Sequence, residues 1–113
     1  MAPAGRSSGA RLAHDVFFTL TDNSPAACDR LVAACYERLA GIPGIVFFTA
    51  GTRVPDLQRD VNDKDYDVSL HVYFESRAAH DAYQQAAPHL QFIADNKANW
   101  KAVRVFDSDL AAR

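Results

Sequence analysis

The chain has 113 residues, of which 49% are hydrophobic and 23% charged, and its formal net charge is -2. This length fits one domain with its own core, and without a basic stripe the chain is a poor partner for nucleic acid or acidic membranes. No apolar run approaches the roughly 18 residues that span a bilayer. Residues 1–11 are rich in Gly, Ser, Pro and Ala and lack the apolar segment of a secretory signal, so we expect a disordered lead-in and a cytoplasmic protein.

The first predicted element is a strand over residues 12–20, with the sequence LAHDVFFTL. Side chains alternate between the two faces of a strand. His14, Val16 and Phe18 therefore share one face, and Phe17 lies on the other.

A helix is predicted to follow this strand. Ser24 is a suitable N-cap and Pro25 fits the first helical position, where its missing N–H is not needed; Gly41 ends the helix. Cys28 and Cys35 are seven residues apart in this helix, which separates them by roughly 10 Å, beyond disulfide reach. We expect both to be reduced core residues.

Strands and a second helix are predicted in the middle of the chain. Residues 44–54 are β-branched and aromatic, as in a strand, and residues 67–75 alternate again. The polar residues 55–66 between them predict a solvated loop. Ser76 caps a second helix, and Pro88 breaks it.

Residues 89–96 are expected to be irregular or helical, and residues 100–106 to form the fourth strand. The order is βαββαβ, the ferredoxin-like α+β arrangement, a four-stranded antiparallel sheet with its helices on one face. The predicted domain covers residues 12–107, and residues 108–113 form a tail.

The sheet is predicted to have a second apolar face, opposite the helices. Phe17, His71 and Tyr73 lie on it, whereas a water-exposed face should alternate apolar with polar residues. A monomer tolerates scattered aromatic residues, but soluble monomers rarely expose a contiguous apolar patch. We therefore expect a homodimer, with these three residues at its interface.

The histidines differ in their predicted surroundings. His80 falls on the helix face opposite Ala79 and is expected to be solvated. Neither it nor His71 has a second histidine at metal-ligand spacing, so no metal site is predicted.

His14 points toward the helices, either as a core residue or as a functional one. Tyr83 lies on the apolar side of the second helix, six residues before His89, which follows the helix break. The two side chains could border a cavity between helix and sheet.

Three segments resemble a known family: LAHDVFFTL, GIPGIVFFTAG and YDVSLHVYFESRAAHDAYQQAAPHLQF. A histidine early in the first strand, an Ile-Pro-Gly turn into the second, and a Tyr with a Pro-His and a later Phe are similar to the stress-responsive A/B barrel domain family. The resemblance covers Ala13 to Asp107. It implies a dimeric α/β barrel, in which two sheets form the barrel and each subunit has a cavity under its helices.

At the reactive positions the chain resembles plant polyketide cyclases, which close a ring by aldol condensation. The resemblance implies that His14, Tyr83 and His89 are catalytic and that no cofactor or metal is needed. A neutral histidine suits proton abstraction near pH 7. One departure stands out: the family commonly reads His-Pro-x-His, where residues 86–89 of this chain read Ala-Ala-Pro-His.

Three functions remain open from the sequence. The chain is a ligand-binding or stress-associated dimer without established chemistry, a cofactor-independent polyketide-cyclase-like enzyme, or a small oxygenase or haem-handling protein with His89 as axial ligand. The predicted ligand is a small aromatic or polyketide-like molecule. The pocket residues predicted to contact it are Val16, Phe18, Cys35, Phe92 and Trp100.

Overall fold

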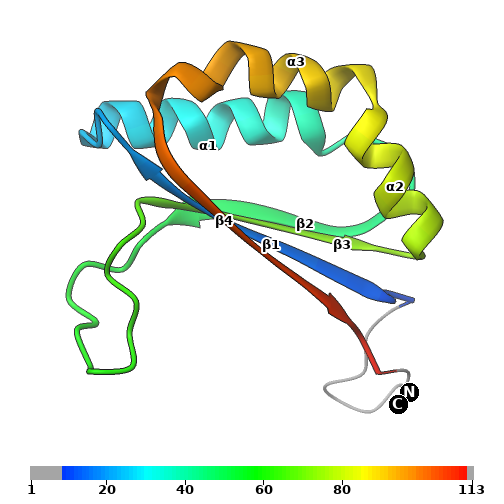
Figure 1. The fold of residues 1–113 in the computed structure, drawn as a ribbon, viewed down its shortest axis with the longest axis horizontal. Coiled ribbons are helices and arrows are strands. Elements are labelled where there is room, and N and C mark those ends of the chain that lie inside the picture. The colour runs from blue at the N-terminus through cyan, green and yellow to red at the C-terminus, as the bar shows by residue number, and fades with distance from the viewer. Residues whose placement is uncertain (1–8, 112–113) are drawn as a thin grey trace.

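A computed structural model describes residues 9–111 as a sheet with helices on one face (Figure 1). Most of the expected N-terminal lead-in, residues 1–8, lies outside the described residues. The elements are β1 (Leu12–Leu20), α1 (Pro25–Leu39), β2 (Ile45–Thr52), β3 (Val68–Phe74), α2 (Arg77–Gln85), α3 (Ala87–Asn96), a 3₁₀ turn η1 (Lys97–Asn99) and β4 (Trp100–Asp109). The predicted ferredoxin-like order is confirmed. Within residues 9–111, no helix is long and apolar enough to cross a membrane.

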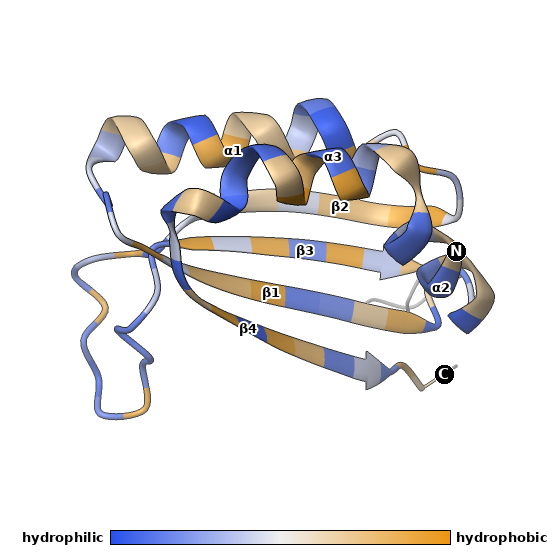
Figure 2. Cartoon of the chain, turned by 45° about the horizontal axis from the view of Figure 1, so that its top comes forward, coloured by the Kyte–Doolittle hydropathy of each residue, from blue (hydrophilic) through white to orange (hydrophobic). Residues whose placement is uncertain are grey.

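The four strands run in the order β2-β3-β1-β4, and every neighbouring pair is antiparallel. Apolar and polar residues alternate along β3 (Figure 2). The apolar set of the two central strands is buried under α1 and α3, so the core lies between sheet and helices. Its strand members are Leu12, Val16, Phe18, Leu20, Val68, Leu70, Val72 and Phe74.

The helices begin where the sequence predicts. The Ser24 hydroxyl accepts a hydrogen bond from the Ala27 N–H at 3.2 Å, and the Ser76 hydroxyl accepts one from the Ala79 N–H at 3.0 Å. The stretch after Pro88, expected to be irregular or helical, is the regular helix α3. Pro88 lies in its first turn, where a missing N–H costs no hydrogen bond.

Gly44 brings the start of β2 against α2. Its φ is +92°, and a Cβ atom there would lie 2.5 Å from the Ala79 Cβ. Only glycine meets both conditions without strain. The Gly44 carbonyl also accepts a hydrogen bond from the Glu75 N–H at 3.0 Å, which joins the start of β2 to the end of β3.

The two edge strands differ from their predicted form. β2 is shorter than the predicted residues 44–54, and β4 continues to Asp109, so the predicted end at Phe106 is wrong and part of the expected tail belongs to the sheet. The β1–β4 register shifts between Thr19 and Leu20. Trp100 therefore lies on the helix side with Val103 and Val105, as expected for a pocket residue, although strict alternation along β4 would put it on the opposite face.

Candidate functional site

A cavity of about 180 Å³ lies between the helix side of the sheet and helices α2 and α3. It is lined by His14, Val16, Phe18, Leu70, Tyr83, Gln84, His89, Phe92, Ile93, Trp100, Val103 and Val105. Four of the five pocket residues predicted from the sequence are in this set. The fifth, Cys35, is not among them: it is fully buried in the core, and burial raises the pKa of its thiol to about 12. It is a protonated packing residue there.

Three residues singled out from the sequence meet at this cavity from three different elements. His14 comes from β1, Tyr83 from α2 and His89 from α3. The ring centroids of Tyr83 and His89 are 4.6 Å apart, and those of His14 and Tyr83 are 5.9 Å apart. All three side chains are buried, so water competes weakly for their polar atoms.

The ring of His89 has a defined proton arrangement. Its Nδ1 lies 3.1 Å from the carbonyl oxygen of Gln84, which can only accept, so Nδ1–H is the donor. The lone pair of the neutral ring then lies on Nε2. Burial lowers the pKa of His89, with smaller contributions from His14 and His80, which keeps the ring unprotonated near neutral pH. His89 thus has the form that a general base requires.

Tyr83 offers the complementary group. Burial raises the pKa of its phenol well above the usual value of 10. The hydroxyl therefore keeps its proton and can donate a hydrogen bond to an oxygen that gains negative charge.

His14 is oriented by an aspartate that the sequence pattern did not predict. Its Nδ1 lies 2.6 Å from Asp107 Oδ1, across the β1–β4 pair in which the two residues are direct partners. The carboxylate fixes the ring and leaves Nε2 for another partner. Val103 and Val105 lie on one face of β4, and the same two-residue spacing continues to Asp107, past the predicted end of the strand. This spacing could have indicated Asp107.

His80 is also part of this region, and the prediction that it is solvated is wrong. Its side chain is only 14% exposed, and its ring packs on His14 at 5.3 Å and on Phe74 at 5.6 Å between centroids. His80 precedes Tyr83 by three residues, the spacing of neighbours on one helix face. The three-residue spacing to Tyr83 indicates that His80 faces inward, whereas its position opposite Ala79 suggested the reverse.

His14, His80 and Asp107 form a cluster of metal-ligand types. Among the described residues, each of the three offers one donor atom, and these atoms all lie within 4.8 Å of one another. The sequence predicted no such cluster because its members are far apart along the chain.

The predicted dimer residues lie on the opposite face of the sheet. Phe17, His71 and Tyr73 line a shallow depression of about 490 Å³ there. Phe17 stacks edge-on against Phe106 at 5.7 Å. His71 Nδ1–H donates to Asp15 Oδ1 at 2.7 Å, so this face also carries a histidine–aspartate pair.

Comparison with solved structures finds the same fold in several proteins. A dimeric ferredoxin-like protein of unknown function from Thermobifida fusca YX is 16% identical with a TM-score of 0.74, and the match covers 97% of this chain and 100% of that one. A Dabb family protein from Mesorhizobium loti is 20% identical with a TM-score of 0.74, covering 90% and 98%. A hydroxynitrile lyase from Passiflora edulis is 21% identical with a TM-score of 0.71, covering 93% and 97%.

No curated protein matches the chain. The model of the stress responsive A/B barrel domain family matches residues 12–110, which include every residue from the start of the first strand to the end of the last. The chain therefore belongs to the stress responsive A/B barrel domain family.

Proposed function

We propose that this protein is a homodimeric, cofactor-independent enzyme that makes or breaks a carbon–carbon bond next to a carbonyl group in a small aromatic substrate. The observation that carries the proposal is the convergence of His14, Tyr83 and His89 on one cavity. The three groups are a base, a hydrogen-bond donor and an oriented imidazole. Together they suit proton-transfer chemistry at an oxygen atom.

The cavity limits the size of the substrate. Its volume of about 180 Å³ is below the range of roughly 300–1,000 Å³ for pockets that take drug-sized ligands. An apolar cavity of about 150 Å³ holds one benzene ring. Phe18, Phe92 and Trp100 supply aromatic walls, so one aromatic ring with a short polar substituent fits best. A haem group or a long poly-β-ketone exceeds this space.

The reaction follows from the proton arrangement of the site. In the cleavage direction, His89 Nε2 takes the proton of the substrate hydroxyl, the C=O double bond forms, and the neighbouring carbon–carbon bond breaks. The departing carbanion then takes the proton from the His89 imidazolium. In the reverse direction, His89 deprotonates the carbon acid, the carbanion adds to the carbonyl carbon, and the new oxygen anion takes the proton from the His89 imidazolium. Tyr83 stabilises the oxygen that gains charge, and the His14 ring, held by Asp107, positions the substrate.

One comparison supports this choice. A hydroxynitrile lyase is among the proteins with the same fold, and a reaction of that type breaks a carbon–carbon bond beside a hydroxyl group. The polyketide-cyclase-like alternative uses the same acid and base for an aldol ring closure, and it requires a substrate short enough for this cavity.

The open face of the sheet supports the dimer. Phe47 packs on Tyr73 at 5.4 Å between ring centroids, and half of the Phe47 and Phe106 surface is accessible in the single chain. Soluble monomers rarely expose a contiguous group of large apolar side chains. Structures with the same fold are described as dimeric. A second copy of the chain is therefore the proposed partner.

The direct test is turnover of mandelonitrile to benzaldehyde and cyanide, followed by the aldehyde absorbance. The wild-type protein should exceed the buffer rate, and His89→Gln should lose the excess while keeping its fold by circular dichroism. His71→Gln is the matched control, because it removes a histidine from the opposite face and should keep the activity. Turnover that survives His89→Gln would show that this ring is not the base. If neither mandelonitrile nor a panel of β-hydroxy ketones reacts, the proposal fails.

A further inference from the structure

His80 contains a polar atom that the rest of the fold does not satisfy. Within residues 9–111, its Nε2 is buried and has no hydrogen-bond partner. A buried polar atom without a partner is costly and rare in native proteins, so its surroundings require an explanation.

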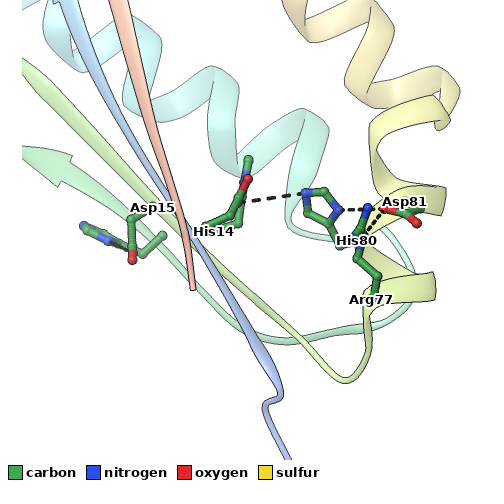
Figure 3. Close-up of polar contacts among 7 residues, drawn as sticks. His14, Asp15, Arg77, His80 and Asp81 are labelled. Carbon is green, nitrogen blue, oxygen red and sulfur yellow. Dashed lines mark hydrogen bonds and ion pairs between the residues drawn. The ribbon is translucent and has the colours of Figure 1, made fainter. Parts of the chain in front are cut away.

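Whether His80 Nε2 carries a proton follows from the hydrogen bond that the other ring nitrogen, Nδ1, makes. His80 Nδ1 lies 3.0 Å from Asp81 Oδ1, and because a carboxylate accepts, Nδ1–H is the donor. Nε2 of the neutral ring then carries a lone pair. Figure 3 shows His80 with Asp81 on one side and His14 on the other. The lone pair is therefore directed toward the group formed by His14 and Asp107, at 4.0 Å from Asp107 Oδ1.

The spacing of the three donors fits one shared ion. Two ligands about 2.1 Å from a tetrahedral zinc ion lie about 3.4 Å apart. The distance from His14 Nδ1 to Asp107 Oδ1 is 2.6 Å, and the distance from His80 Nε2 to the same oxygen is 4.0 Å. The two distances bracket the ideal value, and each needs to change by less than about 1 Å. Rotation of the partly exposed Asp107 side chain can supply that change.

We propose that His14, His80 and Asp107 form a binding site for a divalent transition-metal ion of the zinc class. Two imidazoles and one carboxylate favour Zn²⁺, Co²⁺, Ni²⁺ or Fe²⁺, whereas Mg²⁺ and Ca²⁺ prefer an all-oxygen shell. Three protein ligands also leave a position for water or a small ligand. Asp107 is 46% exposed, so solvent reaches that position.

The residues behind His80 strengthen the proposal. Asp81 accepts the His80 Nδ1 proton, and Arg77 Nε donates to the same Asp81 oxygen at 2.8 Å (Figure 3). Metal-binding histidines usually donate their second N–H to a carboxylate, which fixes the tautomer and the ring orientation. His71 on the other face is different, because both of its ring nitrogens already have partners in Asp15 and Ser69.

The bound ion takes the place of the proton that joins His14 Nδ1 to Asp107. The ring changes tautomer, so that Nε2 carries the proton while Nδ1 binds the ion. The ion ties α2 to β1 and β4 beside Tyr83. The inference does not rest on the proposed reaction, since it uses only the geometry of these three residues.

The test is titration of the purified chain, first freed of metal with a chelator, with Co²⁺ and Zn²⁺. Visible absorption of the Co²⁺ complex reports imidazole coordination, and a thermal-shift assay reports Zn²⁺. We expect one ion per chain and a higher melting temperature with Zn²⁺, with no shift for Mg²⁺ or Ca²⁺. His80→Gln and Asp107→Asn should each remove the Co²⁺ spectrum. Asp81→Asn should weaken binding by roughly 10–100-fold, because it only positions His80.

Two control variants test whether the Co²⁺ spectrum comes from this site. Asp109→Asn removes one charge two residues along β4 and should bind Co²⁺ like the wild type. His89→Gln should also keep the spectrum, even though the proposed reaction predicts that it loses turnover, so the two proposals fail independently. If the wild type gives no Co²⁺ spectrum, or if His80→Gln binds Co²⁺ as tightly as the wild type, the inference is wrong. Asp107→Asn, on an exposed side chain, decides the matter if His80→Gln does not fold.

Discussion

The two faces of the sheet carry the same kind of pair in different surroundings. His14 and Asp15 are neighbours in β1: one meets Asp107 under the helices, and the other meets His71 on the open face. On the helix side, the pair lies beside Tyr83 and a cavity. On the open face, the Ser69 hydroxyl lies 3.2 Å from the second nitrogen of His71, and aromatic side chains surround the pair. The comparison shows that a histidine–aspartate pair alone does not indicate a site, and that the neighbouring groups decide its chemistry.

The largest expected effect comes from breaking one pair at a time. Asp107→Asn removes the carboxylate that orients His14 and should lower kcat/KM for the substrate by roughly 10²–10³-fold, within the usual contribution of acid–base groups. Asp15→Asn, the same change on the open face, should stay within about twofold when measured at dimer-forming concentrations. Equal losses in both variants would contradict the division between the faces.

The open face should respond to a charge placed in its centre. Phe17→Asp puts a carboxylate among aromatic side chains, where burial without a partner costs several kcal/mol. We expect dimer dissociation to become at least about 100-fold more favourable, measured by sedimentation equilibrium. Leu90→Asp, at a half-exposed apolar position on α3, should leave the dimer unchanged. A wild-type chain that is monomeric at micromolar concentration would rule out this role for the face.

The packing of α2 on the start of β2 can be weakened without changing a residue on the open face. Gly44→Ala places a methyl group against Ala79 in a backbone conformation that favours glycine, and should destabilise the fold by about 1–3 kcal/mol. Urea denaturation measures this change. Gly51→Ala is the control, since a Cβ there meets no atom within 4 Å. Similar losses for the two variants would show that the Gly44–Ala79 contact does not position α2.

The smallest expected effect is on the pH dependence of stability. Burial lowers the pKa of His89 below its usual 6.5, so the unfolded chain binds a proton at a pH where the folded chain does not. The contribution of His89 is thus fully present above pH 6.5 and is lost as the pH falls through the lowered folded-state pKa. Measured with a chelator present, the wild type should lose stability in this range more steeply than His89→Gln. Parallel curves would mean that His89 is not desolvated.

The sequence predicted the parts of the fold that depend on regular alternation. His14, Val16 and Phe18 face the helices because β1 has no irregularity over those residues. Tyr83 and His89 reach the same cavity because Pro88 starts a new helix and turns the chain. These positions follow from the two-residue alternation along β1 and from the proline at the start of α3.

Other positions depend on tertiary contacts more than on the local pattern. Trp100 was predicted in the pocket, but the register shift that brings it there becomes visible only when β4 pairs with β1. Asp107 continues β4 through polar residues of low strand propensity, where β1 supplies the pairing. His80 is held inward by contacts with Phe74 and His14, two residues from other elements. Tertiary packing determined each of these positions.

The most direct test of the difference between the faces is nitrogen NMR of the histidine rings during titration with benzaldehyde. We expect the ring signals of His14 and His89 to shift with a common dissociation constant, while those of His71 stay in place. Movement of the His71 signals, with His14 and His89 unchanged, would place ligand binding on the open face and contradict a site under the helices.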